Sequence, residues 1–380
     1  MIDFELSEDQ QMMRDMARDF AEKELKPVAQ KLDEESLWPG EILKKMGELG
    51  FLGMTLPEEF DGAEMDPISY ALAIEEISRG DASCGVIMSI HDSLACELIL
   101  KYGTDYLKKR FLPPLARGEI IGCFSLTEPG AGSDAGAVAT TATKDGDDYV
   151  LNGTKIFVSG GAYADLVILF ASTDRSKGSR GISTFVIPKE TPGLEVGTIE
   201  RKMGLNASGT SELVLTDCRV SKDLLLGEEG QGFKIALLGF DAGRIGIAAQ
   251  AVGIARAALE ESIKYAKERE QFGKPIAGFQ GVQWMIADMA TQIDAARLLT
   301  LRAAHVKSKG KRFSKEAAMA KLFASETCVN ATRLAVQIHG GYGYMKEYAV
   351  ERYYRDAKII EIYEGTSEIM RMIISGALLR

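Results

Sequence analysis

Residues 149–158 of the chain read Tyr149-Val150-Leu151-Asn152-Gly153-Thr154-Lys155-Ile156-Phe157-Val158. Two runs rich in β-branched and aromatic residues flank an Asn-Gly pair, which predicts a β-hairpin with its turn at Asn152 and Gly153. Further short apolar runs follow at 166–170, 182–187 and 213–215, separated by glycine, serine, aspartate and proline. Because these runs do not alternate with helical patterns, they favour an antiparallel sheet or barrel over a Rossmann sheet.

Helical patterns lie on both sides of this β region. Before it, Ser7 and Gln10 form a capping box, Asp66-Pro67 opens a second helix, and Thr104 caps a third. After it, apolar residues recur at helical spacing in four segments joined by short turns, near 233–268, 279–309, 314–338 and 347–376. We therefore expect a mostly α, α+β fold with an N-terminal helical domain at 1–119, a β domain at 120–230 and a four-helix bundle at 231–380.

The composition excludes several classes of function. Of the 380 residues, 46% are hydrophobic and 26% charged, as in ordinary soluble globular proteins. The net charge of −10 argues against nucleic acid and against an anionic membrane surface as partners. Five scattered cysteines without a CxxC pair and three distant histidines predict free thiols and no metal centre. With no signal segment at the N-terminus and no apolar run that looks long enough to span a membrane, we expect a cytoplasmic protein.

The stretch Glu361-Ile362-Tyr363-Glu364-Gly365-Thr366-Ser367-Glu368 places three carboxylates within eight residues. Glu364 stands beside Gly365, and a carboxylate next to glycine suits a base that meets its substrate at close range. The alternative is an ordinary helix start, with Thr366 or Ser367 as the cap and the glutamates as solvated charges.

Other segments are rich in small residues, and each alone is also typical of a turn. They are 124–134, 157–161, 241–246, 269–274 and 337–344. Neither G-x-G-x-x-G after a strand nor G-x-x-x-x-G-K-[ST] occurs, so the two commonest nucleotide-binding motifs are absent.

Taken together and in this order, the motifs resemble the acyl-CoA dehydrogenase family along essentially the whole chain, most closely its short-chain, butyryl-CoA type. The motifs are Leu126-Thr127-Glu128-Pro129-Gly130-Ala131-Gly132-Ser133-Asp134, Asp241-Ala242-Gly243-Arg244-Ile245-Gly246, Arg269-Glu270-Gln271-Phe272-Gly273, Gln337-Ile338-His339-Gly340-Gly341 and Ile362-Tyr363-Glu364-Gly365-Thr366-Ser367-Glu368. The resemblance implies FAD-dependent dehydrogenation of a short-chain acyl-CoA to the trans-2-enoyl-CoA. Glu364 would take the α-proton and flavin N5 the β-hydride, and electrons would pass to an electron-transferring flavoprotein. The family usually forms homotetramers, built as dimers of dimers.

The resemblance also assigns roles to individual residues. Phe157 and Ser159 would flank the flavin ring, where many relatives carry Trp and Thr. The resemblance also implies FAD contacts for Phe124, Leu126 and Thr127 at the flavin ring, for Ser133, and for Gln280, Thr366 and Glu368, which complete the cofactor shell. The FAD of a neighbouring subunit would be reached by Arg269, Gln271, Phe272, Gln337, Gly340 and Gly341.

For the substrate, the resemblance implies that Ser133, Asp241 and Arg244 hold the CoA moiety. Tyr363 and Gly365 would lie beside the thioester, with Gly365 leaving room for the acyl chain. The thioester carbonyl would accept hydrogen bonds from the backbone N–H of the base and from a ribityl hydroxyl of FAD. Some relatives place the base at the position of Gly243, which cannot serve, so Glu364 is the candidate.

Three residues depart from the family pattern. We expect His339 to pack rather than react, and Ala349 replaces a common proline without evident consequence. Asp92 follows His91 on a helix that lines the acyl pocket in relatives; it either points away from the pocket, or meets an unusual acyl group or acts as a second base. The open alternatives for function are a branched, cyclic or dicarboxylic acyl-CoA, an oxidase, and, from a different class, a non-catalytic flavin- or CoA-binding protein.

Overall fold

The structure, a computed structural model, describes residues 5–379. The expectation that no signal segment is present concerns mainly residues 1–4, which lie outside the described residues. Helices make up the chain before Gly122, and the caps expected at Ser7, Asp66 and Thr104 are confirmed. The helices are α1 (Glu8–Phe20), α2 (Ala29–Glu34), α3 (Gly40–Glu48), α4 (Pro67–Gly80), α5 (Ala82–Ile90), α6 (Glu97–Tyr102) and α7 (Asp105–Ala116), with π-helical turns at Ala21–Leu25 and His91–Cys96.

A mixed sheet follows, in the strand order β6-β7-β3-β2-β4-β5-β8, with β1 paired to β4. Most neighbours are antiparallel, as expected, but the β1–β4 and β2–β4 pairs are parallel. The strands are β1 (Gly122–Ser125), β2 (Thr141–Asp145), β3 (Asp148–Val158), β4 (Leu166–Ser172), β5 (Ile182–Pro188), β6 (Leu194–Ile199), β7 (Ser211–Ser221) and β8 (Leu225–Leu226).

The hairpin predicted at Asn152-Gly153 is wrong. Both residues lie inside β3, and the register with β7 shifts between Leu151 and Gly153, which marks a β-bulge. A side chain at Gly153 would place its Cβ 2.8 Å from Thr140 Cα, so the glycine permits close approach of a neighbouring segment. The turn that joins β2 to β3 is instead at 146–147, where Gly146 has a φ of +63°.

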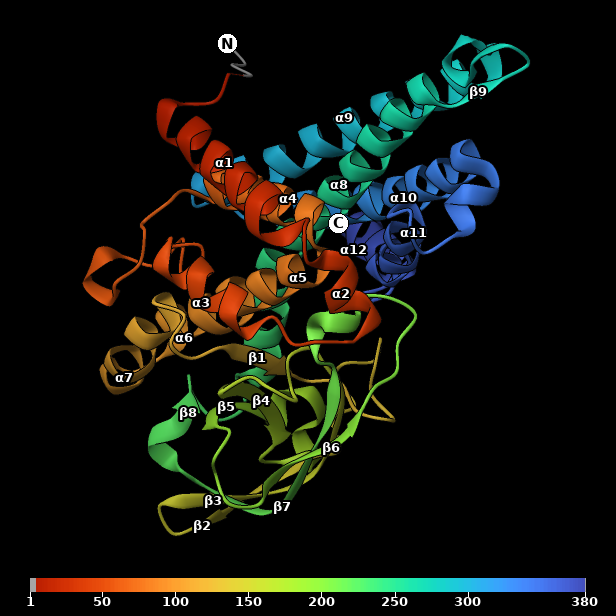
Figure 1. Cartoon of the computed structure of the whole chain (residues 1–380). Coiled ribbons are helices and arrows are strands. Elements are labelled where there is room, and N and C mark those ends of the chain that lie inside the picture. Colours follow the sequence, from red (N-terminus) through yellow and green to blue (C-terminus); the bar gives the residue numbers. More distant parts are fainter. Residues whose placement is uncertain (1–4, 380) are drawn as a thin grey trace.

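The C-terminal part is helical again, and its short β9–β10 hairpin lies at the end of α8 remote from the sheet (Figure 1). The predicted succession of helices, β region and helical bundle is thus confirmed. The elements are α8 (Gly232–Glu268), β9 (Glu270–Gln271), β10 (Lys274–Pro275), α9 (Gln280–Ser308), α10 (Ser314–His339), α11 (Val350–Lys358) and α12 (Ser367–Leu378).

Helix α8 lies in the interior and packs against α4, α9 and α10. Small residues allow this: a Cβ at Gly246 would lie 2.8 Å from Tyr70 Oη on α4. The expectation that no stretch could span a membrane needs correction, because Ala82–Tyr102 and Gly232–Glu268 are long and apolar enough by composition. In each, 83% of the qualifying window is buried inside the protein, as in the core helices of soluble proteins.

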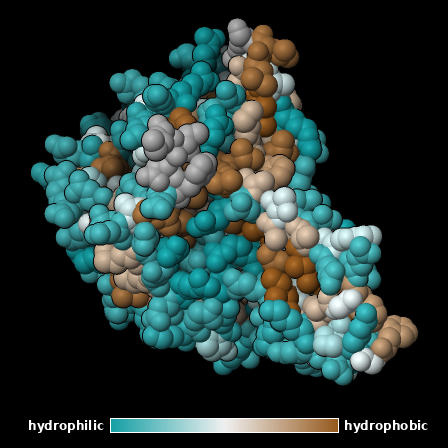
Figure 2. Space-filling view, turned by 90° about the horizontal axis from the view of Figure 1, so that it is seen from above, coloured by the Kyte–Doolittle hydropathy of each residue, from teal (hydrophilic) through white to brown (hydrophobic). Residues whose placement is uncertain are grey.

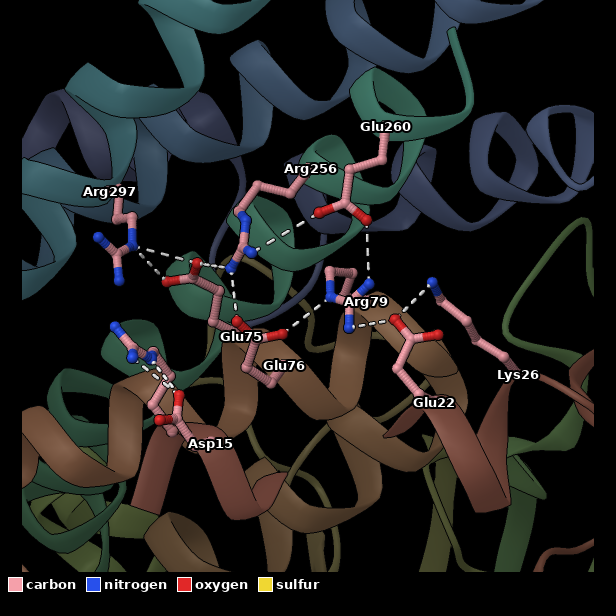
Figure 3. Close-up of polar contacts among 10 residues, drawn as sticks. Asp15, Glu22, Lys26, Glu75, Glu76, Arg79, Arg256, Glu260 and Arg297 are labelled. Atoms are coloured by element: carbon pink, nitrogen blue, oxygen red, sulfur yellow. Dashed lines mark hydrogen bonds and ion pairs between the residues drawn. The ribbon is translucent and has the colours of Figure 1, made fainter. Parts of the chain in front are cut away.

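A buried charge network ties α4 to its neighbours (Figure 3). Arg79 is 0% exposed and pairs with Glu76 at 2.8 Å, Glu22 at 2.7 Å and Glu260 at 3.0 Å. One turn earlier in α4, Glu75 and Glu76 also pair with arginines of the bundle helices α8 and α9. The network fixes the N-terminal helices against the bundle.

Candidate functional site

The helical segment predicted at 347–376 is broken, and Glu364 lies in the break. Helix α11 ends at Lys358, a 3₁₀ turn covers Ile359–Glu361, and α12 begins at Ser367. Glu364 has a φ of +51° and Gly365 a φ of +101°, in the left-handed region that helices do not use. Thr366 Oγ1 accepts a hydrogen bond from Ile369 N at 3.3 Å, so the helix-cap interpretation is right for Thr366 and does not extend to Glu364.

The carboxylate of Glu364 is buried although the residue as a whole is partly exposed. Neither of its oxygens has a hydrogen-bond partner within residues 5–379. Burial raises the pKa of Glu364 to about 7, and the positive charges of Arg244 and Lys321 oppose that rise. A carboxyl group with this pKa and no partner can accept a proton from a ligand near neutral pH.

Two glycines shape the space around this carboxylate. A Cβ at Gly243 would lie 2.9 Å from Glu364 Cδ, so the carboxylate occupies the space above that glycine. A Cβ at Gly365 would lie 2.6 Å from Met370 Cε. Backbone conformation and contact with Met370 therefore explain the glycine at 365, and its proposed role in making room for an acyl chain stays a prediction.

Two buried cations hold successive main-chain carbonyls, those of Glu364 and Gly365. Arg244 donates from Nε to the carbonyl of Glu364 at 3.2 Å and from Nη1 to Asp241 Oδ1 at 2.8 Å. Lys321 of α10, which is 0% exposed, donates from Nζ to the carbonyl of Gly365 at 2.6 Å. Lys321 was not predicted from the sequence, and its signal is a lysine within the alanine-rich part of α10, between Ala320 and Leu322.

The three residues predicted to hold CoA lie along connected cavities. Asp241 and Arg244 line a cavity of about 540 Å³, and Ser133 lines a neighbouring one of about 430 Å³. The two cavities share Phe233 and Leu237 of α8. The two cavities therefore adjoin, and the larger one reaches Arg244, which contacts the Glu364 loop.

Tyr363 points into the protein rather than toward these cavities. Its hydroxyl donates a hydrogen bond to Gln250 Oε1 on α8. Gln250 is 0% exposed, and the sequence analysis did not single it out. The contact anchors the loop one residue before Glu364, and a role of Tyr363 beside the thioester stays a prediction.

The flavin contacts predicted on the sheet lie on the segment that follows β1 and on the end of the neighbouring strand β3. Ile156 N donates to Thr127 O at 2.9 Å, which joins the strand carrying Phe157 to the segment that carries Leu126 and Thr127. Phe157 is 61% exposed and has a φ of +55°, so its ring is available to a flat ligand. Phe124 and Ser159 flank this surface in sequence and are partly buried.

Behind this segment lies a buried ion pair that sequence reasoning missed. Lys155 Nζ donates to Glu128 Oε1 at 2.6 Å and to Leu126 O at 3.1 Å. Glu128 in turn accepts from the main-chain N–H groups of Ala139 at 2.6 Å and Thr140 at 3.1 Å. The pair therefore fixes the backbone of the segment predicted to face the flavin.

The second set of predicted flavin contacts gathers around a cavity of about 590 Å³. Its lining includes Arg269, Gln271, Gly340 and Gly341. Gln337 lies in the last turn of α10 just before this glycine pair, Phe272 is 94% exposed on the β9–β10 hairpin, and Gln280 begins α9. An arginine, an amide and accessible glycine backbone form a donor set that suits a phosphate-bearing ligand.

The two sets lie far apart within one chain. Gly232 begins α8 against the sheet, and Arg269 follows its last residue. A helix of 37 residues is about 55 Å long, and Figure 1 shows β9 at the end of the molecule opposite the sheet. The two sets of one subunit therefore lie near opposite ends of α8, too far apart for one dinucleotide to contact both.

The residues that depart from the family pattern have structural contacts. Asp92 Oδ1 accepts from Gly53 N at 2.5 Å and Met54 N at 3.1 Å, while its Oδ2 is buried without a partner in the described chain. Burial raises the pKa of Asp92 to about 8. His339 stacks on Tyr265 with ring centroids 4.2 Å apart, in agreement with the packing role expected of it.

A metal centre is not supported by residues 5–379, among which no cluster of His, Cys, Asp or Glu could hold an ion. All five cysteines are free, as the sequence predicted, and all are buried.

Comparisons with known proteins cover nearly the whole chain. Family models match residues 7–119 (acyl-CoA dehydrogenase, N-terminal domain), 123–218 (middle domain) and 230–379 (C-terminal domain). The mitochondrial short-chain specific acyl-CoA dehydrogenase of Rattus norvegicus is 54% identical over 99% of this chain and 91% of its own.

Solved structures agree. The structure of butyryl-CoA dehydrogenase from Megasphaera elsdenii has a TM-score of 0.98 and is 46% identical to this chain, and the match covers 100% of both chains. A chain from the structure described as "Electron transferring flavoprotein of Acidaminococcus fermentans: Towards a mechanism of flavin-based electron bifurcation" has a TM-score of 0.99 at 52% identity, also with complete coverage of both.

Proposed function

Because the chain belongs to the acyl-CoA dehydrogenase family, we propose that it dehydrogenates a short-chain acyl-CoA to the trans-2-enoyl-CoA with FAD as cofactor. The observation that carries the proposal is the Glu364 carboxylate, which is buried, has no partner among residues 5–379 and faces the glycine at position 243.

Glu364 is the base in this proposal. The α-proton of a thioester is weakly acidic, so its removal needs a base that is both close and poorly solvated. With a pKa raised to about 7, the carboxyl group is largely ionised above that pH and has a higher proton affinity than an exposed glutamate. Because neither oxygen is engaged, the carboxylate can turn toward the substrate without breaking a hydrogen bond.

The main chain of the same residue supports the developing negative charge. Removal of the α-proton gives the thioester carbonyl enolate character, which hydrogen-bond donors stabilise. Among the main-chain hydrogen bonds of residues 5–379, none is donated by Glu364 N–H. Base and donor thus belong to one residue, whose conformation is set by Arg244 and Lys321.

The residues present fit FAD in two places, the surface around Phe157 and Thr127 and the cavity around Arg269 and Gly340. FAD, when bound, supplies the acceptor for the β-hydride. Phe157 would wall the ring, and Arg269 with Gln271 would hold the phosphate-bearing part from a neighbouring subunit. The length of α8, about 55 Å, supports this shared arrangement, because the helix separates the two places within one subunit.

We extend the proposal to a homotetramer and to an electron-transferring flavoprotein as electron acceptor. Large apolar side chains stand exposed near β9 and on α9, among them Phe272 at 94% and Trp284 at 61%. Figure 2 shows that apolar residues gather in a band on an otherwise mostly hydrophilic face. Such surface is typical of contacts with other subunits or proteins.

The test is an anaerobic titration of the purified protein with acyl-CoA thioesters that differ in length, branching and a terminal carboxylate. We expect a flavin absorbance spectrum that butyryl-CoA bleaches fastest, with crotonyl-CoA as the product. A faster response to branched, cyclic or dicarboxylic thioesters would replace the short-chain assignment. A protein that carries no flavin would contradict the proposal.

A further inference from the structure

Lys321 is a buried cation whose hydrogen bond goes to a peptide carbonyl rather than to a carboxylate. It lies on α10, its side chain is 0% exposed, and its Nζ donates to Gly365 O at 2.6 Å. Burial of an ammonium group is costly, and one hydrogen bond to a neutral carbonyl returns little of that cost. Packing alone would favour an alanine or leucine here, as at the neighbouring positions of the helix.

The position of this ammonium complements that of Arg244. From α8, Arg244 Nε holds the carbonyl of Glu364 at 3.2 Å, and from α10, Lys321 Nζ holds the next carbonyl, that of Gly365. The two carbonyls belong to the two residues that form the left-handed turn, Glu364 with a φ of +51° and Gly365 with a φ of +101°. A left-handed glutamate is unfavourable by itself, so contacts from the surrounding structure must maintain it.

We propose that Lys321 is a positioning residue for the base: it fixes the Gly365 carbonyl, and thereby sets the direction of both the carboxylate and the N–H of Glu364. This inference rests on the proposed function, since it takes Glu364 to be the base. The charge of Lys321 also stabilises the ionised form of Glu364, so one side chain controls both the geometry and the protonation of the base.

The charged and titratable groups around the pair come from four elements. Lys321 faces Arg244 of α8, Glu361 and Glu364 of the loop, and Glu368 of α12. Besides these two cations, Glu364 faces the phenols of Tyr70 on α4 and of Tyr363. Removal of Lys321 therefore removes one of the two positive charges that act on the carboxylate.

The test compares Lys321→Met, Lys321→Arg and a matched control, Lys202→Met, as FAD-loaded enzymes. Lys202 is partly buried and, like Lys321, donates to uncharged oxygens, the hydroxyls of Ser208 at 3.2 Å and Thr210 at 3.0 Å. The measurements are melting temperature, FAD content, and kcat for butyryl-CoA against pH. Infrared titration of the Glu364 carboxyl, as a difference from Glu364→Gln, reads its pKa without turnover.

For Lys321→Met we expect kcat to fall about tenfold or more. The acid limb of the pH profile and the infrared pKa of Glu364 should both move up by about one unit, because loss of a cation favours the protonated carboxyl. Lys321→Arg should restore the acid limb but not the full kcat, since guanidinium keeps the charge but not the shape of the ammonium. Lys202→Met should lower the melting temperature and leave the pH profile unchanged.

An unchanged pH profile and infrared pKa in Lys321→Met, with only a lower melting temperature as in Lys202→Met, would overturn the inference. The two hypotheses fail separately. If Glu364→Gln keeps its turnover, the proposed function fails; if Glu364→Gln is inactive while Lys321→Met behaves as wild type, the role of Lys321 alone fails.

Discussion

Gly243→Ala should separate activity from stability. In the structure a Cβ at this position would lie 2.9 Å from Glu364 Cδ and closer still to Oε2, whereas ordinary contacts begin near 3.4 Å. The glutamate side chain must therefore move by at least about 0.5 Å, and a misplacement approaching 1 Å costs about 100-fold in rate. Because the carboxylate end is free to shift, the fold should tolerate the change, and alanine is favoured over glycine within a helix by up to about 1 kcal/mol.

The assay for this variant is the single-turnover rate of flavin bleaching by butyryl-CoA, with melting temperature measured on the same sample. Gly376→Ala is the matched control, because Gly376 lies in α12 and no other atom would come within 4 Å of its added Cβ. We expect a rate about 100-fold lower in Gly243→Ala with an equal or higher melting temperature. A rate within twofold of wild type, or a melting temperature that falls sharply, would refute the reasoning.

Three further predictions follow from buried charges. Glu364→Gln should be more stable than wild type by up to about 3 kcal/mol at pH 8 in denaturant unfolding. The folded-state pKa of Glu364 is raised from 4.5 to about 7, so the cost of this carboxylate to stability is absent below pH 4.5 and complete above about pH 7. Equal stabilities at pH 8 would contradict this. Arg79→Met should cost about 1–3 kcal/mol in the same measurement, because buried Glu76 loses one of its two arginine partners and keeps Arg256. Arg117→Met, in an exposed pair with Glu119, should cost under about 1 kcal/mol. Lys155→Met should weaken FAD retention about tenfold, measured by absorbance after dialysis, since Glu128 loses the partner that fixes the Leu126 segment. Lys155→Met combined with Glu128→Gln should recover part of that loss. Unchanged retention in the single variant would exclude a role of Lys155 in FAD binding.

The sequence predicted the succession of helices, sheet and bundle because periodicity and caps are local signals. Asp66 and Thr104, for example, cap the helices that they precede. The errors arose where a contact distant in sequence decides the conformation. Gly153 was taken for a turn residue, although it is in β3 because Thr140 packs closely against it.

In the site, too, local motifs were predicted and contacts between distant residues were not. Glu364 was predicted from its motif, but the break in the last helical segment was not, because Ile359, Ile360 and Ile362 continue an apolar helical pattern through the loop. Lys321 could not be assigned from the sequence, since its partner lies 44 residues away at Gly365. Parallel pairing of β1 with β4 likewise depends on how the chain crosses the sheet, and local pattern does not specify that.

The identity of the base is tested most directly by the anaerobic rate of flavin bleaching by butyryl-CoA in Glu364→Gln and in Glu361→Gln. Glu361 lies three residues earlier and pairs with Lys358 at 2.5 Å, so its variant controls for loss of a carboxylate in the same loop. Glu364→Gln should keep its FAD and lose several orders of magnitude in rate, and Glu361→Gln should stay near the wild-type rate. Near-normal bleaching in Glu364→Gln would contradict the assignment of Glu364 as the base.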